Sequence, residues 1–571
     1  MKIVVGSSLL LLIVFLIFSK IRPSILFGFI AVFYYIVGYL DLNSWLVSYT
    51  SSSLITLVML LLISVAVEKS IAIDLLSKIM ISKNYIISLL KLGVISMSIS
   101  AFLNNTAVVA SFMGAIKNNK FQAPSKLLIP LSYFSILGGT MTLIGTSTNL
   151  IVNSFVVQNE LPSLKIFDFF YVGVLISIFC LLGIIIFNKL LPNYENENKM
   201  EQNHIINAKV LKNSELIGKS IEENKLRKLE YLFLFEIQRD DYAINPVSKD
   251  EIIKENDILI FSGNINYISI LNKFKGISIG KENIKLNELQ LVEVVISQES
   301  NLVGKSVKES NFRTKFDASI VSFRKRNSYV TKIGNSMLEV GDRLILSIGK
   351  DFKNRDNIKK NFHVLSNINQ NNKLNNFKSL IVFFGFIITI IVSALEFISL
   401  LKASIIFLIL LLAFKIISLS EIKRQFPLEI FIIIGSSLAI TKVLVNCGLA
   451  NDLGVFIANI FGSYGIYGSF IGIYIFTLLL TEIMTNNAAA ALSFPIALST
   501  AIALNVNPTP FIFAVAYGAS AAFLFPHSYQ THLMVSSICG YKLQDFFKIG
   551  WVISIIYSLV VIIATPIFFN F

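Results

Sequence analysis

Two stretches of this 571-residue chain carry a pair of asparagines in the middle of an otherwise apolar run. The first reads SAFLNNTAVVASF at residues 100–112, and the second reads TEIMTNNAAAALSF at residues 481–494. In the hydrocarbon of a bilayer every backbone N–H and C=O group needs a partner, and irregular backbone is tolerated only where protein or a water-filled cavity surrounds it. If these runs lie in a membrane, their polar centres are therefore candidate binding sites.

The composition favours a membrane protein. Hydrophobic residues make up 54% of the chain and charged residues 15%, which is more apolar than a soluble protein of this length can bury. The net charge is +14, but lysine and arginine are scattered through loops and form no stripe with interleaved aromatics, so we expect no nucleic-acid partner. Because the sequence shows no nucleophile–base pair and no closed set of metal ligands, we expect a protein that is not an enzyme.

Residues 192–372 contain no run long enough to span a bilayer, which predicts a soluble insert. The insert repeats internally, and the matching segments are SELIGKSIEEN at 214–224 with SNLVGKSVKES at 300–310, and ENDILIFSGN at 255–264 with VGDRLILSIG at 340–349. A repeat of this kind predicts two tandem copies of one αβ module, at 205–280 and 285–365.

Each copy contains Gly-Lys-Ser, at 218–220 and 304–306, without the upstream glycine that a P-loop needs. We interpret both as turns that precede a short helix. The repeat resembles the C-terminal (TrkA-C type) regulatory module of potassium-uptake and potassium-channel proteins. That resemblance implies a cytosolic regulator, so a nucleotide or ion is an expected ligand of the insert.

The flanking halves, 1–191 and 373–571, repeat as well. The asparagine pairs are 382 residues apart, and two further polar motifs, TSTNLIV at 146–152 and YQTHLMV at 529–535, are 383 residues apart. Most basic residues fall on one side if 84–116 is a re-entrant hairpin, which places the N-terminus outside and the insert in the cytoplasm. The predicted fold is thus an α-helical polytopic protein of the cell (inner) membrane. It has inverted repeats with re-entrant hairpins and broken helices, plus a cytosolic insert of two small α+β domains.

The polar motifs have the chemistry of an ion site. The N-terminus of a half-helix offers free N–H groups to an anion, and its C-terminus offers carbonyl oxygens to a cation. Asparagine and threonine add neutral oxygens that suit a hard monovalent cation. We expect each hairpin tip to pack against the break of its own half, with one cation site per half and an anion between them. The alternative is that these polar residues only join helices to one another.

Together, NNTAVVA, GGTMTLIGTSTNLIVN, TNNAAAALSFPIA and YQTHLMV resemble the divalent anion:sodium symporter family of the ion transporter superfamily, in its bacterial subgroup with two potassium-uptake-type modules between the halves. In that family the hairpin tips read Ser-Asn-Thr and contact both sodium and a sulfate or carboxylate substrate. The resemblance implies substrate-binding roles for Asn104, Asn105, Thr106, Asn486, Asn487, Ala488, Thr531 and His532. It implies sodium ligands at Asn105, Gly145, Thr146, Asn149, Asn487 and Ser528.

Three of the six tip positions depart from the family pattern, since asparagine replaces serine twice and Ala488 replaces threonine. His532 stands where that pattern usually has asparagine, and it either meets the anion, titrates, or fills the place of the amide with a hydrogen bond. Glu482 lies one helical turn before Asn486 in an apolar arm, and we align it with Ser100 in the first half. This glutamate is expected to bind a cation, carry a coupling proton, or sit neutral against a neighbouring helix.

We therefore expect a secondary active transporter that couples sodium to the uptake of sulfate or a small dicarboxylate. The family resemblance implies an elevator-like motion and a homodimer in contact with membrane lipid. Sulfate is favoured because the motifs contain no lysine or arginine to pair with carboxylates. Two alternatives remain open: a sodium/proton antiporter of the same superfamily, in which Glu482 and His532 titrate, and a ligand-gated ion channel.

Overall fold

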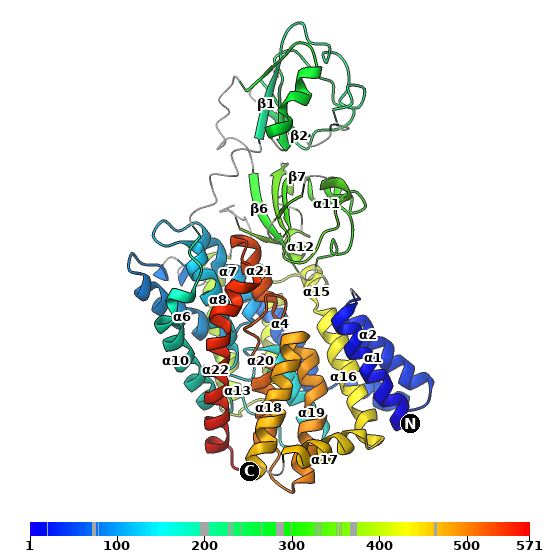
Figure 1. The fold of residues 1–571 in the computed structure, drawn as a ribbon, viewed down its shortest axis with the longest axis vertical. Helices are drawn as coiled ribbons and strands as arrows, with labels where there is room; N and C mark the ends of the chain where they lie inside the picture. The colour runs from blue at the N-terminus through cyan, green and yellow to red at the C-terminus, as the bar shows by residue number, and fades with distance from the viewer. Residues whose placement is uncertain are drawn as a thin grey trace.

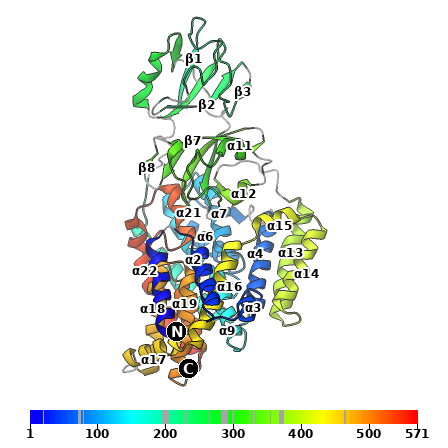
Figure 2. The ribbon, with the colours of Figure 1, turned by 90° about the vertical axis from the view of Figure 1, so that its right-hand side faces the viewer.

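A computed structural model gives the fold. It describes the whole chain except residues 20, 71–75, 78, 195–204, 227–228, 230–231, 241, 264, 281–290, 298–299, 326–327, 331–332, 350, 353–354, 356, 366–373 and 462–464. The expected ends of the insert and the first residues expected for its second module, 285–290, lie largely outside the described residues. Figures 1 and 2 show a bundle of helices with two strand-containing units stacked at one end, and both chain termini at the other end.

The first half of the chain forms helices before the insert. They are α1 (Lys2–Phe18), α2 (Pro23–Ile36), α3 (Leu42–Tyr49), α4 (Ser52–Glu68), α6 (Tyr85–Ser100), α7 (Asn105–Lys117), α8 (Pro124–Gly139), α9 (Ser147–Gln158), α10 (Phe170–Ile186) and the short η1 (Asn188–Leu190).

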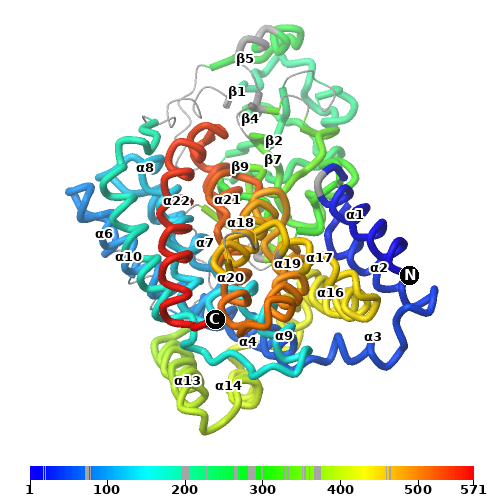
Figure 3. The backbone as a smooth tube through the Cα atoms, turned by 60° about the horizontal axis from the view of Figure 1, so that its bottom comes forward, coloured from blue at the N-terminus to red at the C-terminus, as the bar shows by residue number. Residues whose placement is uncertain are grey.

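The second half of the chain is helical too. Its helices are α13 (Asn376–Ala394), α14 (Leu400–Ala413), α15 (Leu419–Gln425), α16 (Leu428–Asn446), α17 (Leu449–Phe461), α18 (Gly465–Ile483), α19 (Asn486–Ala503), α20 (Thr509–Ser520), α21 (Gln530–Cys539) and α22 (Leu543–Phe568). The two halves interleave, because α2 packs on α16 and α10 packs on α22 (Figure 3).

Five helical spans among the described residues are long and apolar enough to cross a membrane. They are Leu42–Glu68, Asn376–Ala394, Leu428–Asn446, Gly465–Ile483 and Leu543–Phe568. Several other apolar helices are shorter, and the two helices of the first hairpin, α6 and α7, have 16 and 13 residues. A helix of 13 residues is about 20 Å long at 1.5 Å per residue, which is less than the hydrocarbon thickness.

Each half contains a helix–turn–helix followed by an interrupted helix. In the first half, α6 and α7 are joined by residues 101–104, and residues 140–146 separate α8 from α9. In the second half, α18 and α19 are joined by residues 484–485, and residues 521–529 separate α20 from α21. In Figures 1 and 2 the α6–α7 pair lies toward the insert, whereas the α18–α19 pair lies toward the chain termini.

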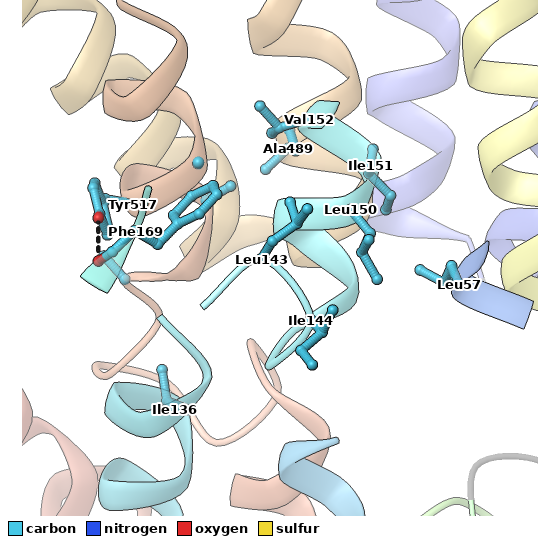
Figure 4. Packing of buried hydrophobic residues seen from close by; sticks show 14 of the residues in the cluster. Leu57, Ile136, Leu143, Ile144, Leu150, Ile151, Val152, Phe169, Ala489 and Tyr517 are labelled. Carbon is cyan, nitrogen blue, oxygen red and sulfur yellow. Dashed lines mark hydrogen bonds between the residues drawn. The ribbon is translucent and has the colours of Figure 1, made fainter. Parts of the chain in front are cut away.

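Helix α8 is almost completely buried, and the chain around its break packs tightly. A Cβ added at Gly138 would lie 2.6 Å from the Cα of Met97, so α6 and α8 approach each other backbone to backbone. Leu143 and Ile144 within the break and Leu150 in α9 pack into the surrounding core (Figure 4). This packing encloses the irregular backbone of residues 140–146 in protein, as a membrane-embedded segment requires.

The insert consists of two five-stranded antiparallel sheets. The first sheet has the order β3-β2-β4-β1-β5, with β1 (Ile205–Val210), β2 (Leu232–Arg239), β3 (Tyr242–Ile244), β4 (Ile258–Gly263) and β5 (Ile277–Ile279). The second has the order β10-β6-β9-β7-β8, with β6 (Leu291–Ile296), β7 (Ala318–Lys325), β8 (Ser328–Tyr329), β9 (Arg343–Ile348) and β10 (Phe362–Val364). Read from the other edge, the second order matches the first strand for strand. The second sheet lies between the helical bundle and the first sheet (Figure 1).

Each Gly-Lys-Ser of the insert opens a capping box, which explains its sequence without a phosphate. The Glu223 carboxylate accepts from the Ser220 N–H (2.7 Å), and the Ser220 hydroxyl accepts from the Glu223 N–H (3.2 Å). Ser306 and Glu309 repeat the pattern. The residues that follow form turns in both copies, and in the second copy the short helix α11 (Phe312–Phe316) comes next; α12 (Ile358–Asn361) precedes β10.

Replacing Gly138 with alanine tests the close approach of α6 and α8. The added methyl group meets backbone atoms of Met97 that cannot move aside, and we expect a loss of about 1–3 kcal/mol of stability. Gly28→Ala is the control, because its methyl would meet only side-chain atoms at ordinary contact distances, of Ile432 at 3.5 Å and of Ser436 at 4.0 Å, and alanine is favoured over glycine in a helix. Thermal unfolding of the purified proteins measures both effects. Equal melting temperatures for the two variants would contradict the packing.

Candidate functional site

The tip of the first hairpin is bonded to the break in the second half. The Asn105 side chain accepts a hydrogen bond from the Ser100 hydroxyl (2.7 Å) and donates one to the Tyr529 hydroxyl (2.5 Å). The Thr106 hydroxyl donates to the side-chain oxygen of Gln530 (3.1 Å). Tyr529 also meets the side chain of Thr146, so it connects the breaks of the two halves.

The tip of the second hairpin makes the reciprocal contact. The Ser147 hydroxyl, at the first residue of α9, donates to the side-chain oxygen of Asn487 (3.0 Å). The tip side chains therefore bond the half opposite, whereas we expected each tip to pack against the break of its own half. Within each half, Thr142 donates to the carbonyl of Ala101, and Thr481 donates to the carbonyl of Ala519 at the end of α20 (2.6 Å). Side chains cross between the halves, whereas backbone carbonyls anchor each hairpin within its half.

These contacts correct the register between the two hairpins. The hydroxyl of Ser100 donates to Asn105, and the hydroxyl of Thr481 lies at the same place against Asn486, 3.0 Å from its side-chain oxygen, with its one hydrogen shared between Asn486 and the carbonyl of Ala519. Helices α7 and α19 begin at these same two asparagines. The counterpart of Asn105 is therefore Asn486, 381 residues further on, and the spacing of 382 inferred from the asparagine pairs was wrong by one residue.

The corrected register changes three assignments. The second tip is Thr485-Asn486-Asn487, and Thr485 retains the hydroxyl that a serine would carry there. Ala488 lies further along α19, fully buried, and is no longer the counterpart of Thr106. The first-half counterpart of Glu482 is Ala101, so the second half alone has a carboxylate at this position.

The first break gathers oxygen atoms. A Cβ at Gly145 would lie 2.8 Å from the carbonyl oxygen of Gly139 and 2.9 Å from that of Ala101, so only glycine fits at this approach. The Asn149 side chain donates to the carbonyl of Thr142 (2.9 Å), while its own oxygen is buried and has no hydrogen-bond partner among the described residues. A buried acceptor of this kind is rare without a ligand, ion or water, and neutral oxygens suit a monovalent cation.

Glu482 holds the second break. One carboxylate oxygen accepts from the backbone N–H groups of Phe523 (2.8 Å) and Leu524 (2.9 Å). The other oxygen is buried and has no hydrogen-bond partner within the described part of the chain. The side chain of Ser528 and the backbone of Phe525 also lie close to this carboxylate, and the Ser528 hydroxyl donates its hydrogen to the carbonyl of Phe525 (2.7 Å). The glutamate thus satisfies two amides of the irregular segment and leaves one acceptor for a cation or a proton.

Thr531 and His532 lie away from the hairpin tips. The Nε2 atom of His532 is 2.9 Å from the carbonyl oxygen of Ala522, and Nδ1 is 2.7 Å from the hydroxyl of Ser132. A carbonyl only accepts, so the neutral ring carries its proton on Nε2. The single hydrogen of the Ser132 hydroxyl then goes to Nδ1, and the hydroxyl of Thr531 lies 2.7 Å from the same oxygen; all three side chains are fully buried. The geometry fits the interpretation in which His532 fills the place of an amide.

Several residues of the site escaped the sequence-based assignment of roles. They are Ser100, Ser132, Thr142, Ser147, Thr481, Tyr529 and Gln530. One signal was available, because a hydroxyl residue stands five positions before the tip asparagine in both hairpins. The partners across the halves had no such signal, since they lie hundreds of residues away.

Four helices begin at this site: α7, α9, α19 and α21. Their N-terminal N–H groups carry partial positive charge and suit an anion. The hairpin turns and breaks contain no lysine or arginine, and the described residues contain no group of three His, Cys, Asp or Glu that could hold a metal ion. The site can therefore receive a monovalent cation on its oxygens and an anion on its helix N-termini.

Long apolar helices, paired hairpins and interrupted helices around one polar site define a polytopic membrane transporter. The family model described as citrate transporter matches residues 13–518 and 384–571, and the chain belongs to this family. A transporter is thus established and an enzyme excluded, as the sequence predicted.

Named relatives agree with this class. An uncharacterized transporter of Synechocystis sp. is 27% identical over 81% of this chain and 79% of its own length. Sodium/sulfate cotransporter 1 of Chlamydomonas reinhardtii is 27% identical over 61% of this chain and 41% of its own length. The sodium-dependent dicarboxylate transporter SdcS of Staphylococcus saprophyticus is 29% identical over 26% of this chain and 28% of its own length.

Two replacements of Glu482 test its two carboxylate oxygens separately. One oxygen accepts from backbone amides, and the other has no hydrogen-bond partner among the described residues. Glu482→Ala leaves the N–H groups of Phe523 and Leu524 without an acceptor, and we expect a loss of about 1–3 kcal/mol for each buried amide. Glu482→Gln keeps one side-chain oxygen for both amides and should melt close to the wild-type protein. Thermal unfolding of the two variants checks this difference, and an alanine variant as stable as the glutamine variant would contradict it.

Proposed function

We propose that this protein is a secondary active transporter that couples sodium to the movement of a divalent anion, sulfate or a small dicarboxylate, across the cell membrane. The main observation behind the proposal is that each hairpin tip forms a hydrogen bond with the opposite half of the chain. Thr106 donates to Gln530, and Asn487 accepts from Ser147. Neutral oxygens and four helix N-termini meet there without a cationic side chain. The printed names of relatives that transport sulfate or dicarboxylates with sodium support the same substrates.

Sodium is the proposed driving ion because each half offers oxygens without a cage of carboxylates. In the first half, Asn105 and Asn149 would supply side-chain oxygens, and the segment at Gly145 and Thr146 would supply backbone carbonyls. In the second half, the corrected register assigns Asn486 to the place of Asn105. Ser528 and Glu482 would complete that second site, whose extra negative charge makes it unlike the first.

The anion would lie between the two tips. Asn104 and Thr106 face it from the first half, and Thr485 and Asn487 face it from the second in the corrected register. Compared with the Ser-Asn-Thr pattern, Asn104 replaces the serine of the first tip and Asn487 replaces the threonine of the second, so each tip has an amide in place of one hydroxyl. An amide can still donate an N–H to an anion oxygen. Sulfate fits best, because nothing at the tips can pair with a carboxylate as arginine does.

Movement across the membrane would follow from the two-fold arrangement. We propose that the two halves are inverted repeats and that the hairpins and interrupted helices move together as an elevator against the remaining helices, in a homodimer surrounded by lipid. The insert would lie in the cytoplasm, where its TrkA-C-like modules would bind a nucleotide or ion. The matched strand orders of its two sheets support a tandem repeat.

Uptake into proteoliposomes tests the transport proposal. With an inward sodium gradient, labelled sulfate or succinate should accumulate above the level reached with potassium in place of sodium. Citrate is included because of the family description. Accumulation of none of the three anions would refute sodium-driven symport, and currents far above carrier turnover would favour a channel.

The Glu482→Gln variant tests how the cation is coupled. If the unpartnered oxygen binds sodium, the sodium concentration for half-maximal uptake should rise about tenfold, which is ~1.4 kcal/mol of lost binding. The maximal rate at saturating sodium is the matched reference. A sodium-dependent pH change in liposomes without any added anion, lost in this variant, would instead establish the antiporter.

A further inference from the structure

The second sheet of the insert is attached to two particular helices of the bundle. Lys117, the last residue of α7, forms an ion pair with Glu293 on β6. Glu293 also pairs with Arg343 on the neighbouring strand β9. Arg343 donates a further hydrogen bond to the carbonyl of Ile538 near the end of α21 (3.1 Å). The three charged side chains are 16%, 10% and 8% exposed in the order Lys117, Glu293 and Arg343, so the cluster is almost closed to solvent.

Apolar and backbone contacts surround this cluster. Val295 of β6 and Leu365 after β10 belong to the same buried apolar core as the helical bundle. The Asn118 side chain donates to the carbonyl of Leu365 (3.5 Å), and a Cβ at Gly341 would lie 3.3 Å from the carbonyl of Leu533 on α21. The sheet is thus seated on α7 and α21.

These two helices also form part of the candidate site. They pack against each other along their length, and their first residues contact through Thr106 and Gln530. Helix α7 has 13 residues and α21 has 10, so they run roughly 20 and 15 Å from the site to the sheet. The insert therefore holds the far ends of the two helices whose near ends carry the candidate ligands.

The charges complement the helix ends. Lys117 lies in the last turn of α7, and Arg343 meets a carbonyl of the last turn of α21, where a cation is stabilised by the helix dipole. Glu293 joins the two cations. Removing one member of a buried ionic cluster leaves the others uncompensated, so the contact depends on all three charges.

The cluster belongs to the second sheet alone. In the second sheet, Val295 on β6 is paired with Arg343 on β9. The equivalent pair in the first sheet joins Lys209 on β1 to Ile258 on β4. Asn207 occupies the place of Glu293, because it stands two residues before Lys209 as Glu293 stands two before Val295. The repeated fold does not require these charges, and they occur where the sheet meets the helices.

We infer that Glu293 and Arg343 of the insert are positioning residues for the transport site, which fix the relative placement of α7 and α21 and hence the distance between Asn105–Thr106 and Tyr529–Gln530. The inference rests on the proposed function for its transport consequence. A ligand that shifts the second module would change the geometry of the candidate site by moving α7 and α21.

The test compares Glu293→Gln and Arg343→Gln with the wild-type full chain in lipid bilayers. Hydrogen exchange of residues 105–109 and 530–532, which lie outside the contact with the sheet, should accelerate in both variants, because the ends of the helices that touch the sheet are released. In sodium-driven sulfate uptake, KM should rise about three- to thirty-fold with a smaller change in kcat, since binding geometry is what changes. Arg343→Lys should recover part of both effects, because it retains the charge beside Glu293.

Arg239→Gln is the matched control. Arg239 is a buried arginine of the first sheet, bonded to Asp257 (2.8 Å) and Glu251 (2.9 Å), and it lies outside the contact with the helices. This variant loosens the insert but should leave exchange at the site and KM unchanged. If exchange accelerates only within the insert, or if Arg239→Gln matches the other variants, the inference is overturned. Absence of uptake by the wild-type protein would count against the proposed function alone, because hydrogen exchange still decides the positioning role.

Discussion

The architecture depends on satisfying irregular backbone inside an apolar bundle. Two hairpin turns and two helix breaks expose N–H and C=O groups that no helix can pair internally. A few side chains satisfy these groups. Thr142 and Thr481 each donate a hydrogen bond to a backbone carbonyl, and Glu482 accepts hydrogen bonds from two backbone amides. Among the buried side-chain oxygens that have no hydrogen-bond partner within the described residues are that of Asn149 and one of Glu482, and these two lie where an ion can use them. Fold and site thus arise from the same constraint.

The two halves satisfy their irregular backbone with nearly the same contacts, but they differ at one position. Both place a hydroxyl five residues before a buried tip asparagine, and both send a tip side chain across to the other half. Only the second half adds a carboxylate, Glu482, where the first half has Ala101. A pair of otherwise similar cation sites with unequal charge would differ in affinity, and such a difference would allow ordered binding of two ions.

Much of this arrangement could be predicted from local patterns. The polar centres of apolar runs marked the hairpin 84–116, because polar residues are costly in hydrocarbon. The motifs 146–152 and 529–535 were expected to be the breaks themselves, but most of their residues form the first turns of α9 and α21, and the irregular segments are 140–146 and 521–529, just before them. The register of the two halves could not be predicted as well. The asparagine pairs suggested 382, but which asparagine starts each helix depends on the hydroxyl that bonds it, and the contacts give 381.

The sequence by itself determined the class of the molecule and marked the segments in which its polar turns lie, since both follow from hydrophobicity along the chain. Only the tertiary structure decided which breaks meet. It paired Asn105 with Tyr529, buried His532 against Ser132, and placed Arg343 of the insert on the end of α21. The physical reason is that these contacts join residues up to hundreds of positions apart. A hydrogen bond or ion pair over such a separation produces no periodic pattern in the sequence.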